Sequence, residues 1–181
     1  KLTLKYAKSV NLWVCNSENT KNRIKKYYNQ VAVIINPPVE TKDYKYSQPS
    51  NYWLSVNRLV THKRIDLQVE AFKKIPTEKL IIVGSYEEGV EQFESYKSYI
   101  EKIKPTNVEI VHWVDDKKLK DLYSNCKGFI TTAHDEDFGM TVIEAMAAGK
   151  PVVAPMEGGY RETVTNKTGV LIDNINSEKI S

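Results

Sequence analysis

Two carboxylates flank a glycine in the C-terminal third of the chain and could bind a polar ligand. Glu136 lies in an acidic loop, and Gly139 lets the backbone turn tightly before an apolar, alanine-rich run begins. We expect that run to form a helix over residues 140–148, whose first amides would be free to donate to hydroxyl or phosphate oxygens. Glu144 would project from its second turn and accept from a diol such as a ribose. The alternative, an ordinary helical glutamate favoured by the helix dipole, stays open.

A cluster of cations forms the second candidate binding element. Arg58, His62, Lys63 and Arg64 lie between an expected strand and an expected helix. Cationic side chains that converge with helix N-terminal amides suit a phosphate or a diphosphate. Charge alone does not separate this interpretation from a solvated basic loop, so both are kept.

The sequence excludes several other kinds of site. It contains no Gly-x-Gly-x-x-Gly dinucleotide fingerprint, and Gly149-Lys150 is followed by Pro151, so there is no Walker A motif. It also lacks the Gly-x-Ser-x-Gly of a serine nucleophile. The three histidines lie in separate loops without the spacing of metal ligands, so we expect no metal site. Gly84, at the end of an expected strand, would let a planar or anionic group approach the backbone closely.

The elements that must position these residues follow from an alternation of strands and helices after residue 51. Each expected strand is a continuous apolar run, which is typical of a parallel sheet covered on both faces. The sequence therefore predicts an α/β fold, a doubly wound, Rossmann-like parallel sheet that binds ligands at the carboxyl ends of its strands. The expected strands are residues 52–57, 79–84, 108–114, 128–132, 151–154 and 170–172; the expected helices are residues 65–75, 90–103, 116–124, 140–148 and 160–165, with a last one beginning near 177.

The first 50 residues have a different pattern. A short apolar run at residues 12–15 precedes Ser17, a good N-cap for a helix over residues 18–28. Residues 31–35 are rich in valine and isoleucine and predict a buried strand, and the prolines after them predict a connector. We place a domain boundary here, with a residual strand–helix–strand over residues 1–35 and the ligand-binding domain over residues 36–181.

Composition limits the classes of protein. No apolar stretch approaches the length of about 18 residues that a membrane-spanning helix needs. The net charge of +3 is too small to indicate nucleic acid binding, but the first 50 residues carry nine Lys and Arg against three Asp and Glu. That segment either faces phosphates, an anionic membrane or an acidic partner, or is a solvated helix face.

Cys15 and Cys126 lie in separate apolar runs, which fits reduced core thiols in a cytoplasmic protein.

Several of these motifs together resemble one known family. Seven residues separate Glu136 from Glu144, and Lys63 follows Arg58 by five positions. The second glutamate opens the sequence Glu144-Ala145-Met146-Ala147-Ala148-Gly149-Lys150-Pro151-Val152-Val153. This order and spacing resembles the C-terminal, nucleotide-sugar-binding domain of retaining GT-B glycosyltransferases of family 4, the glycosyl transferases group 1. The resemblance covers about residues 31–172. The variants Lys63-Arg64-Ile65-Asp66 and Glu136-Asp137-Phe138-Gly139 are most similar to mannosyltransferases of polysaccharide or lipid-linked oligosaccharide assembly.

The resemblance implies three residues that act on the donor and others that hold it. Arg58 and Lys63 would grip the diphosphate and stabilise the leaving group, and Glu136 would bond to the donor sugar. Catalysis would then rest on positioning and on electrostatic stabilisation of a departing phosphate and an oxocarbenium-like sugar. The expected donor-binding residues are Gly84, Trp113 and Val114 beside the base, Phe138, Gly139, Met140 and Thr141 through their amides, and Glu144 at the ribose.

The resemblance also implies the donor and the partners. It implies GDP-mannose as the donor, retention of configuration by front-face attack, and neither a metal nor another cofactor. The acceptor would be a saccharide or a lipid-linked molecule, reached in the cytoplasm or at the inner face of the membrane. Because members of this family also have an N-terminal acceptor domain, we expect these 181 residues to be a fragment that binds a nucleotide sugar weakly and transfers nothing alone.

Departures from the family pattern leave alternatives. Asn57, Arg64 and Trp113 stand where the family usually has glycine, and Ala133-His134 replace the common Pro-Ser. These changes put the base and the sugar in question, so a UDP-sugar-using transferase, or an epimerase or phosphorylase of related fold, remains an alternative. A non-catalytic nucleotide-sugar-binding or scaffold module is the alternative from a different class.

Overall fold

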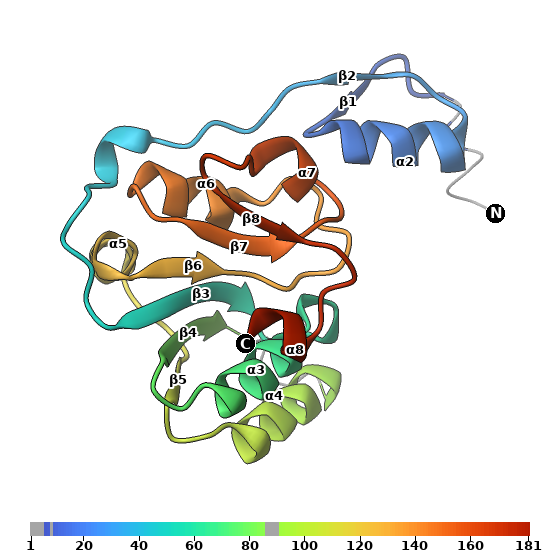
Figure 1. The fold of residues 1–181 in the computed structure, drawn as a ribbon. Coiled ribbons are helices and arrows are strands. Elements are labelled where there is room, and N and C mark those ends of the chain that lie inside the picture. Colours follow the sequence, from blue (N-terminus) through green and yellow to red (C-terminus); the bar gives the residue numbers. More distant parts are fainter. Residues whose placement is uncertain (1–5, 8, 86–90) are drawn as a thin grey trace.

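Six parallel strands form the central sheet of the computed structural model, which describes residues 6–7, 9–85 and 91–181 (Figure 1). The strand order is β5-β4-β3-β6-β7-β8. The chain winds outward from β3 to β5, returns to the middle at β6, and winds outward again to β8. This confirms the predicted doubly wound parallel sheet. The strands are β3 (Tyr52–Arg58), β4 (Lys79–Ser85), β5 (Val108–Val111), β6 (Gly128–Ile130), β7 (Val152–Pro155) and β8 (Gly169–Ile172).

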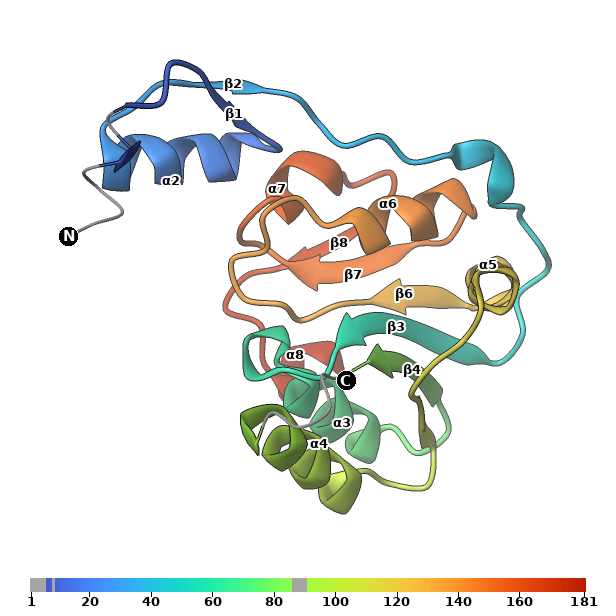
Figure 2. The same cartoon turned by 180° about the vertical axis from the view of Figure 1, so that it is seen from behind.

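Helices cover both faces of this sheet (Figures 1 and 2). One face packs against α3 (Ile65–Lys74), α4 (Glu91–Ile103) and α8 (Ser177–Ile180). The other packs against α5 (Asp116–Asn125), α6 (Met140–Ala147) and α7 (Tyr160–Thr163). These bounds lie within two residues of the predicted ones, although the predicted start of α4 at Val90 falls outside the described residues.

The strands carry apolar residues on both faces because both faces are buried. In β4, Leu80 and Ile82 join the apolar cluster under α3 and α4, whereas Ile81 and Val83 join the cluster under α5 and α6. Successive side chains of a strand point to opposite faces, so a continuous apolar run fills two cores at once. The predicted apolar stripe of α3 is buried at Ile65, Val69 and Phe72.

The winding reverses between β3 and β6, which are neighbours in the middle of the sheet. The chain leaves β3 toward α3 on one face and leaves β6 toward α6 on the other. The two loops therefore diverge at the carboxyl edge and open a crevice between them, the usual place for a ligand in this architecture.

Residues 13–34 form a separate unit beside the main sheet (Figure 1). β1 (Trp13–Cys15) and β2 (Ala32–Ile34) pair in parallel, and α2 (Glu18–Tyr28) connects them. The predicted bounds of α2 are confirmed, and so is its cap, because the Ser17 side chain accepts from the Thr20 amide. A linker with a single 3-10 turn, η1 (Thr41–Asp43), leads from this N-terminal unit to β3.

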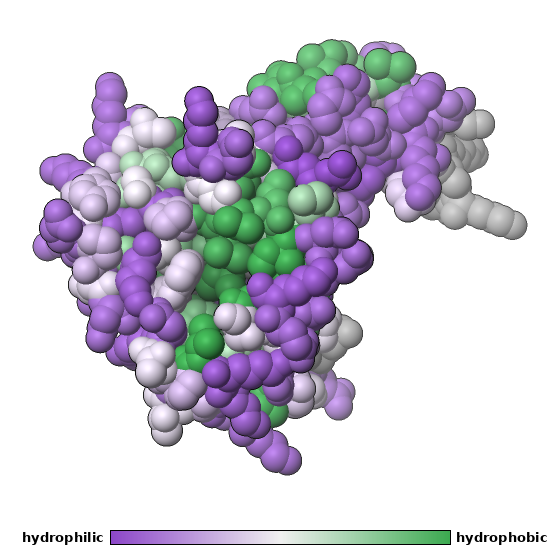
Figure 3. All heavy atoms as spheres, in the orientation of Figure 1, coloured by the Kyte–Doolittle hydropathy of each residue, from purple (hydrophilic) through white to green (hydrophobic). Residues whose placement is uncertain are grey.

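Residues 31–35 contain the predicted strand, β2, but the prediction that it is buried is wrong for one of its two faces. Val31 is 75% exposed, Val33 53% and Ile35 63%. Figure 3 shows apolar side chains gathered on the outer surface of the N-terminal unit, over β1 and β2. An apolar run fits burial, but burial of both faces needs a layer on each side. α2 packs on one face of this small sheet, where Ala32 is 3% exposed, and the other face is exposed.

Two strands of the main sheet end earlier than predicted, β5 at Val111 and β6 at Ile130. After β6, the Thr132 hydroxyl turns to the carbonyl oxygens of the loop that follows β3. Cys15 and Cys126 are both buried and free, as expected. Across the described residues, no helix has the length and apolar character that crossing a membrane requires.

Candidate functional site

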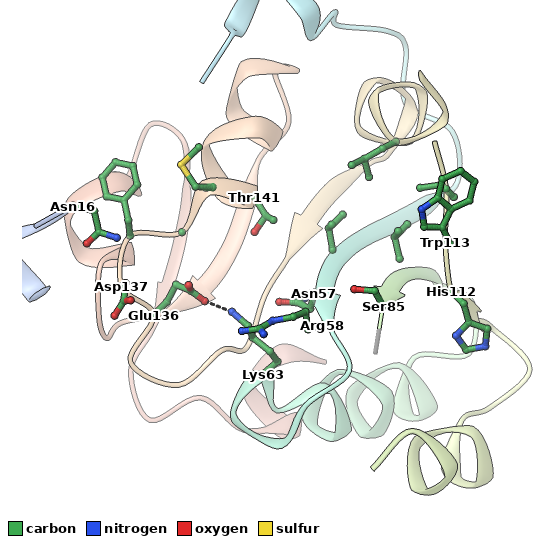
Figure 4. Close-up of a pocket in the computed structure, with 17 residues that line it drawn as sticks. Asn16, Asn57, Arg58, Lys63, Ser85, His112, Trp113, Glu136, Asp137 and Thr141 are labelled. Atoms are coloured by element: carbon green, nitrogen blue, oxygen red, sulfur yellow. Dashed lines mark hydrogen bonds and ion pairs between the residues drawn. The ribbon is translucent and has the colours of Figure 1, made fainter. Parts of the chain in front are cut away.

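A cavity of about 500 Å³ opens at the carboxyl edge of the sheet, where the loops after β3, β5 and β6 meet (Figure 4). The loop after β3 supplies cations, and the loop after β5 supplies an aromatic wall. The loop after β6 supplies carboxylates and leads into the N-terminus of α6. Nine of the eleven predicted site residues line this cavity: Arg58, Lys63, Trp113, Val114, Glu136, Phe138, Gly139, Met140 and Thr141.

Lys63 and Glu136 form an ion pair in this cavity (Figure 4). Lys63 ends the 3-10 turn η2 (Thr61–Lys63) after β3, and Glu136 belongs to the loop after β6, so the pair joins the two loops. The Lys63 side chain is 14% exposed and that of Glu136 is 23% exposed. At this degree of burial, either charge alone would bear an uncompensated desolvation cost.

Arg58 is the second cation, at the end of β3. Its side chain is exposed and has no ion-pair partner in the part of the chain that the structure describes. Figure 4 shows it beside Lys63, on the same side of the cavity. Adjacent cations repel each other unless an anion lies between them, so the arrangement suits a diphosphate. His62 lies between these two cations in the sequence. Burial lowers its pKa, and the positive charges of Lys63 and then Arg58 lower it further.

Backbone hydrogen bonds hold the loops after β3 and β6 together. The His134 amide donates to the His62 carbonyl at 2.8 Å. The Thr132 hydroxyl lies 2.8 Å from the carbonyl oxygens of both Lys63 and Arg64. The two halves of the crevice are therefore fixed relative to each other before a ligand binds.

Arg64 connects this pair of loops to a third. Its φ of 49° lies in the left-handed region that favours glycine, a strain of about 1–2 kcal/mol. Its Nε donates to the Thr132 carbonyl at 2.6 Å, and its guanidinium pairs with Glu157 in the loop after β7. Charge-assisted bonds of this kind are strong enough to offset the strain.

Tyr160 supports both the glycine turn and the carboxylate. Gly139 precedes α6 with a φ of 89°, and a Cβ at this position would lie 2.7 Å from the Tyr160 ring. The buried Tyr160 hydroxyl lies 2.9 Å from that of Thr131 and donates to Glu136 at 3.5 Å. Burial, and then the Glu136 charge, raises the pKa of Tyr160 well above its usual value.

The N-terminus of α6 reaches the cavity through Met140 and Thr141. Among the described residues, no backbone or side-chain group accepts from the amides of these two residues. The first amides of a helix lack helical partners and carry its positive dipole end, so they suit an anion or a hydroxyl.

Glu144 lies one turn further along α6 and outside the lining of the cavity. The buried Tyr123 of α5 donates to its carboxylate at 2.7 Å. Burial and then the Glu144 charge raise the pKa of both neighbouring tyrosines, that of Tyr44 to about 12. The carboxylate is thus held in one orientation, and its contact with a ribose stays a prediction.

The loop after β5 provides the opposite wall, with Trp113 and Val114. Trp113 is 78% exposed, so an indole face is available to a planar ligand. Gly84 does not line the cavity: a Cβ there would lie 2.7 Å from Leu59 Cδ2. The packing of Leu59 therefore explains this glycine, and its contact with a base stays a prediction.

The carboxylates around Glu136 are engaged within the protein. Asp135 and Asp137 both form ion pairs with Arg23 of α2. Across the described residues, no group of three or more His, Cys, Asp or Glu side chains is arranged to hold a metal ion.

Comparison with known proteins identifies the family. The family model of glycosyl transferases group 1 matches residues 38–181. The chain belongs to this family. An alpha-1,3/1,6-mannosyltransferase of Dictyostelium discoideum is 31% identical over 157 residues, covering 76% of this chain and 36% of that relative. An O-antigen chain mannosyltransferase of Salmonella typhimurium is 30% identical over 169 residues, covering 90% of this chain and 46% of that relative. The chain therefore spans less than half of the length of both.

A solved structure supports the fold of this group 1 glycosyltransferase domain. The Anabaena protein HepE, solved in complex with UDP and glucose, superposes with a TM-score of 0.81. The match covers 94% of this chain and 51% of that one, at 21% identity. At this identity it shows the GT-B fold alone.

Some residues that line the site of this glycosyltransferase domain, or support it, were not predicted. Ser85 lies two positions after Val83 on β4, so strand alternation could have placed it beside the cavity. Tyr160 follows Gly158-Gly159, but no pattern in the sequence joins its ring to Gly139. Asn16 reaches the cavity from the N-terminal unit, which no local pattern could indicate.

Proposed function

We propose that this chain is the donor-binding domain of a retaining glycosyltransferase of family 4, which uses a nucleotide-activated sugar to extend a saccharide or lipid-linked acceptor. Residues 36–181 form this domain, the C-terminal half of the enzyme, and residues 1–35 are a residual strand–helix–strand from the inter-domain region. The observation that supports this most is the Lys63–Glu136 pair beside Arg58, in a cavity at the switch point of a doubly wound sheet.

The cations hold the diphosphate of the donor. Arg58 offers a planar fork of donors and Lys63 a point charge, and together they match the two negative charges of the group. When the diphosphate binds, Lys63 shares its charge between the phosphate and Glu136. The carboxylate then has acceptor capacity for the hydroxyls of the donor sugar.

The remaining donor contacts lie in the same cavity or, for Glu144, just outside its lining. The free amides of Met140 and Thr141 bind phosphate or sugar oxygens at the start of α6. Glu144, held by Tyr123, accepts from the ribose diol. The exposed indole of Trp113 stacks on the base, an interaction that tolerates any base because each has a π face.

Transfer breaks the bond between the sugar C1 and the β-phosphate oxygen, and the electron pair of that bond leaves with the diphosphate. Arg58 and Lys63 stabilise the charge that develops on the departing oxygen. An acceptor hydroxyl attacks C1 from the same face, its proton passes to the departing phosphate, and the new glycosidic bond retains the configuration. The cations of the chain neutralise the leaving group, so we propose that no metal or other cofactor is needed.

The proposed donor is GDP-mannose. The mannosyltransferases of Dictyostelium and Salmonella, at 31% and 30% identity, favour it. UDP-sugars are the alternative, because the similar fold of HepE was solved with UDP and because Asn57 and Trp113 depart from the family pattern at the cavity. We place the transfer in the cytoplasm, with a lipid-linked acceptor at the inner face of the membrane.

A thermal-shift comparison tests the proposal. GDP, UDP and ADP are added separately to the chain and to the Arg58→Ala/Lys63→Ala double variant. We expect one nucleotide to stabilise the wild type and none to stabilise the double variant. Stabilisation by none, or equal stabilisation of both proteins, contradicts the assignment. Sugar transfer by the protein that contains both halves separates an enzyme from a non-catalytic module.

A further inference from the structure

The helix of the N-terminal unit contacts the loop that carries Glu136. Asn19 of α2 donates through Nδ2 to the Asp135 carboxylate at 3.0 Å and to the Glu136 carbonyl at 3.2 Å. Arg23, one turn later on the same face of α2, pairs with Asp137 and lies 3.9 Å from Asp135. The two side chains therefore bind the backbone of Glu136 and the acids on either side of it.

The start of α2 is anchored to the main domain by Glu162 of α7. Its two carboxylate oxygens accept from the amides of Glu18 and Asn19 at 2.8 Å each. These are first-turn amides, which lack helical acceptors and favour a negative charge. Figure 1 shows this end of α2 directed at α7. The two-point contact fixes the angle at which α2 meets the loop.

Two glycines close the other side of the same loop. A Cβ on Gly158 would lie 2.5 Å from the Glu136 carbonyl oxygen, and the Gly159 amide donates to that oxygen at 2.7 Å. Asp135 has a φ of 45°, in the left-handed region that aspartate adopts more readily than most non-glycine residues. The loop is thus held between the glycine pair and α2.

Charge gives Arg23 a second role. Asp135, Glu136 and Asp137 are consecutive carboxylates at the rim of a cavity that suits a diphosphate. Lys63 pairs with the middle one and Arg23 with the outer two. Without Arg23, the outer carboxylates would repel both Glu136 and an anionic ligand.

We propose that Asn19 and Arg23 are positioning residues that fix the loop of Glu136 from the N-terminal unit, so that the placement of this unit controls how the donor sugar is held. The role in sugar binding rests on the proposed function; the contact with the loop does not. The apolar surface over β1 and β2 faces away from this contact and takes no part in it.

The first test needs no ligand. Amide hydrogen exchange is measured over residues 135–138 in the wild type, Asn19→Ala and Arg23→Ala. We expect the loop amides of each variant to exchange about tenfold faster, the equivalent of one charge-assisted hydrogen bond. Lys25→Ala is the matched control, since it removes a charge from the same helix and Lys25 has no side-chain partner among the described residues. Unchanged exchange in both variants overturns the proposal.

The second test separates positioning from simple stabilisation. Affinities for the pairs GDP and GDP-mannose, and UDP and UDP-glucose, are measured with the wild type and the same variants. We expect Asn19→Ala to reduce the affinity for the nucleotide sugar while that for the nucleotide alone stays the same. For Arg23→Ala we expect a larger loss of affinity for the nucleotide sugar. Arg23→Lys should restore part of this affinity, because it restores the charge without the planar fork.

The outcomes distinguish the two levels of the proposal. If the loop exchanges faster in the variants but the wild type binds no nucleotide, the proposed function is contradicted and the contact of Asn19 and Arg23 with the loop is still supported. If the wild type binds a nucleotide sugar and the variants bind it equally well despite faster exchange, the positioning role in sugar binding is wrong. Equal losses for nucleotide and nucleotide sugar in both variants also contradict it.

Discussion

The Lys63 ammonium is bonded to the Glu136 carboxylate across the crevice between the loops after β3 and β6. Without a ligand, the charge of each residue is paired with that of the other. Under the proposed function, a diphosphate would compete with Glu136 for the lysine, and a sugar would compete with Lys63 for the carboxylate. Loss of the Lys63 charge should therefore weaken the binding of a nucleoside diphosphate, whereas loss of the Glu136 charge should not.

We expect Lys63→Ala to weaken the binding of a nucleoside diphosphate by about tenfold or more, the loss of one charge-assisted bond. Glu136→Gln should leave that affinity unchanged or raise it, because the lysine is freed. The same Glu136→Gln change should lower the additional affinity that the donor sugar provides. Isothermal titration calorimetry with the diphosphate and the nucleotide sugar measures both quantities.

Lys73→Ala is the matched control for this comparison. Lys73 is an exposed cation at the end of α3, away from the cavity. A loss of diphosphate affinity in Glu136→Gln as large as that in Lys63→Ala would show that the pair acts as one structural unit rather than as two ligand contacts.

Glu144 and Tyr123 test the ribose contact. Because Tyr123 donates to Glu144 at 2.7 Å, we expect Tyr123→Phe to release the carboxylate and to lower nucleotide affinity several-fold. Glu144→Gln should bind the nucleoside diphosphate and its 2′-deoxy form equally, whereas the wild type should prefer the ribose form. A preserved preference in Glu144→Gln would remove this residue from the ribose site.

The fold follows from patterns that act over short distances in the sequence. The apolar runs of β4 and β7 predict buried parallel strands, and the Ser17 cap and the spacing in α3 predict helices whose bounds are nearly correct. At residues 31–35 the strand was predicted correctly but its burial was not, because α2 covers one face of the strand and leaves Val31, Val33 and Ile35 exposed on the other.

The part of the candidate site that could be predicted from the sequence is the part formed by charged residues and glycines in the loops after the strands. Arg58, Lys63 and Glu136 meet because the ends of parallel strands share one edge of the sheet. The contacts of Arg23 and Tyr160 depend on how distant elements pack, and Gly84 has a packing partner, Leu59, that strand position alone does not indicate.

Arg64 offers a stability test in which two effects oppose each other. Arg64→Ala loses the bonds to Thr132 and Glu157 but keeps the left-handed backbone strain. Arg64→Gly loses the same bonds and relieves the strain, which is about 1–2 kcal/mol. We expect stability to fall in the order wild type, Arg64→Gly, Arg64→Ala, measured by chemical unfolding. Arg64→Gly as stable as the wild type would mean that the arginine contacts contribute little.

Glu78 provides a pH-dependent test of the interactions at the amino-terminal edge of the main sheet, just before β4. Hydrogen bonds from Lys127 and then Trp53 lower the pKa of Glu78 below its usual 4.5. The unfolded chain therefore binds the proton more tightly, so this contribution is complete above about pH 4.5 and is lost as pH falls through the lower, folded value. We expect Glu78→Gln to be destabilised by about 1 kcal/mol at pH 7, after allowance for solvent screening, and this difference from the wild type to shrink in acid. Urea unfolding of both proteins over this range measures it, and a difference that is constant with pH would contradict the ionic interaction.

The most direct measurement of the central claim is the calorimetric affinity of the chain for a nucleoside diphosphate, with and without Arg58 and Lys63. We predict measurable binding of GDP or UDP by the wild type, a loss of at least about tenfold in each single variant, and no detectable binding in Arg58→Ala/Lys63→Ala. Binding that survives in the double variant, or a wild type that binds neither nucleotide, would contradict a donor-diphosphate site in this cavity.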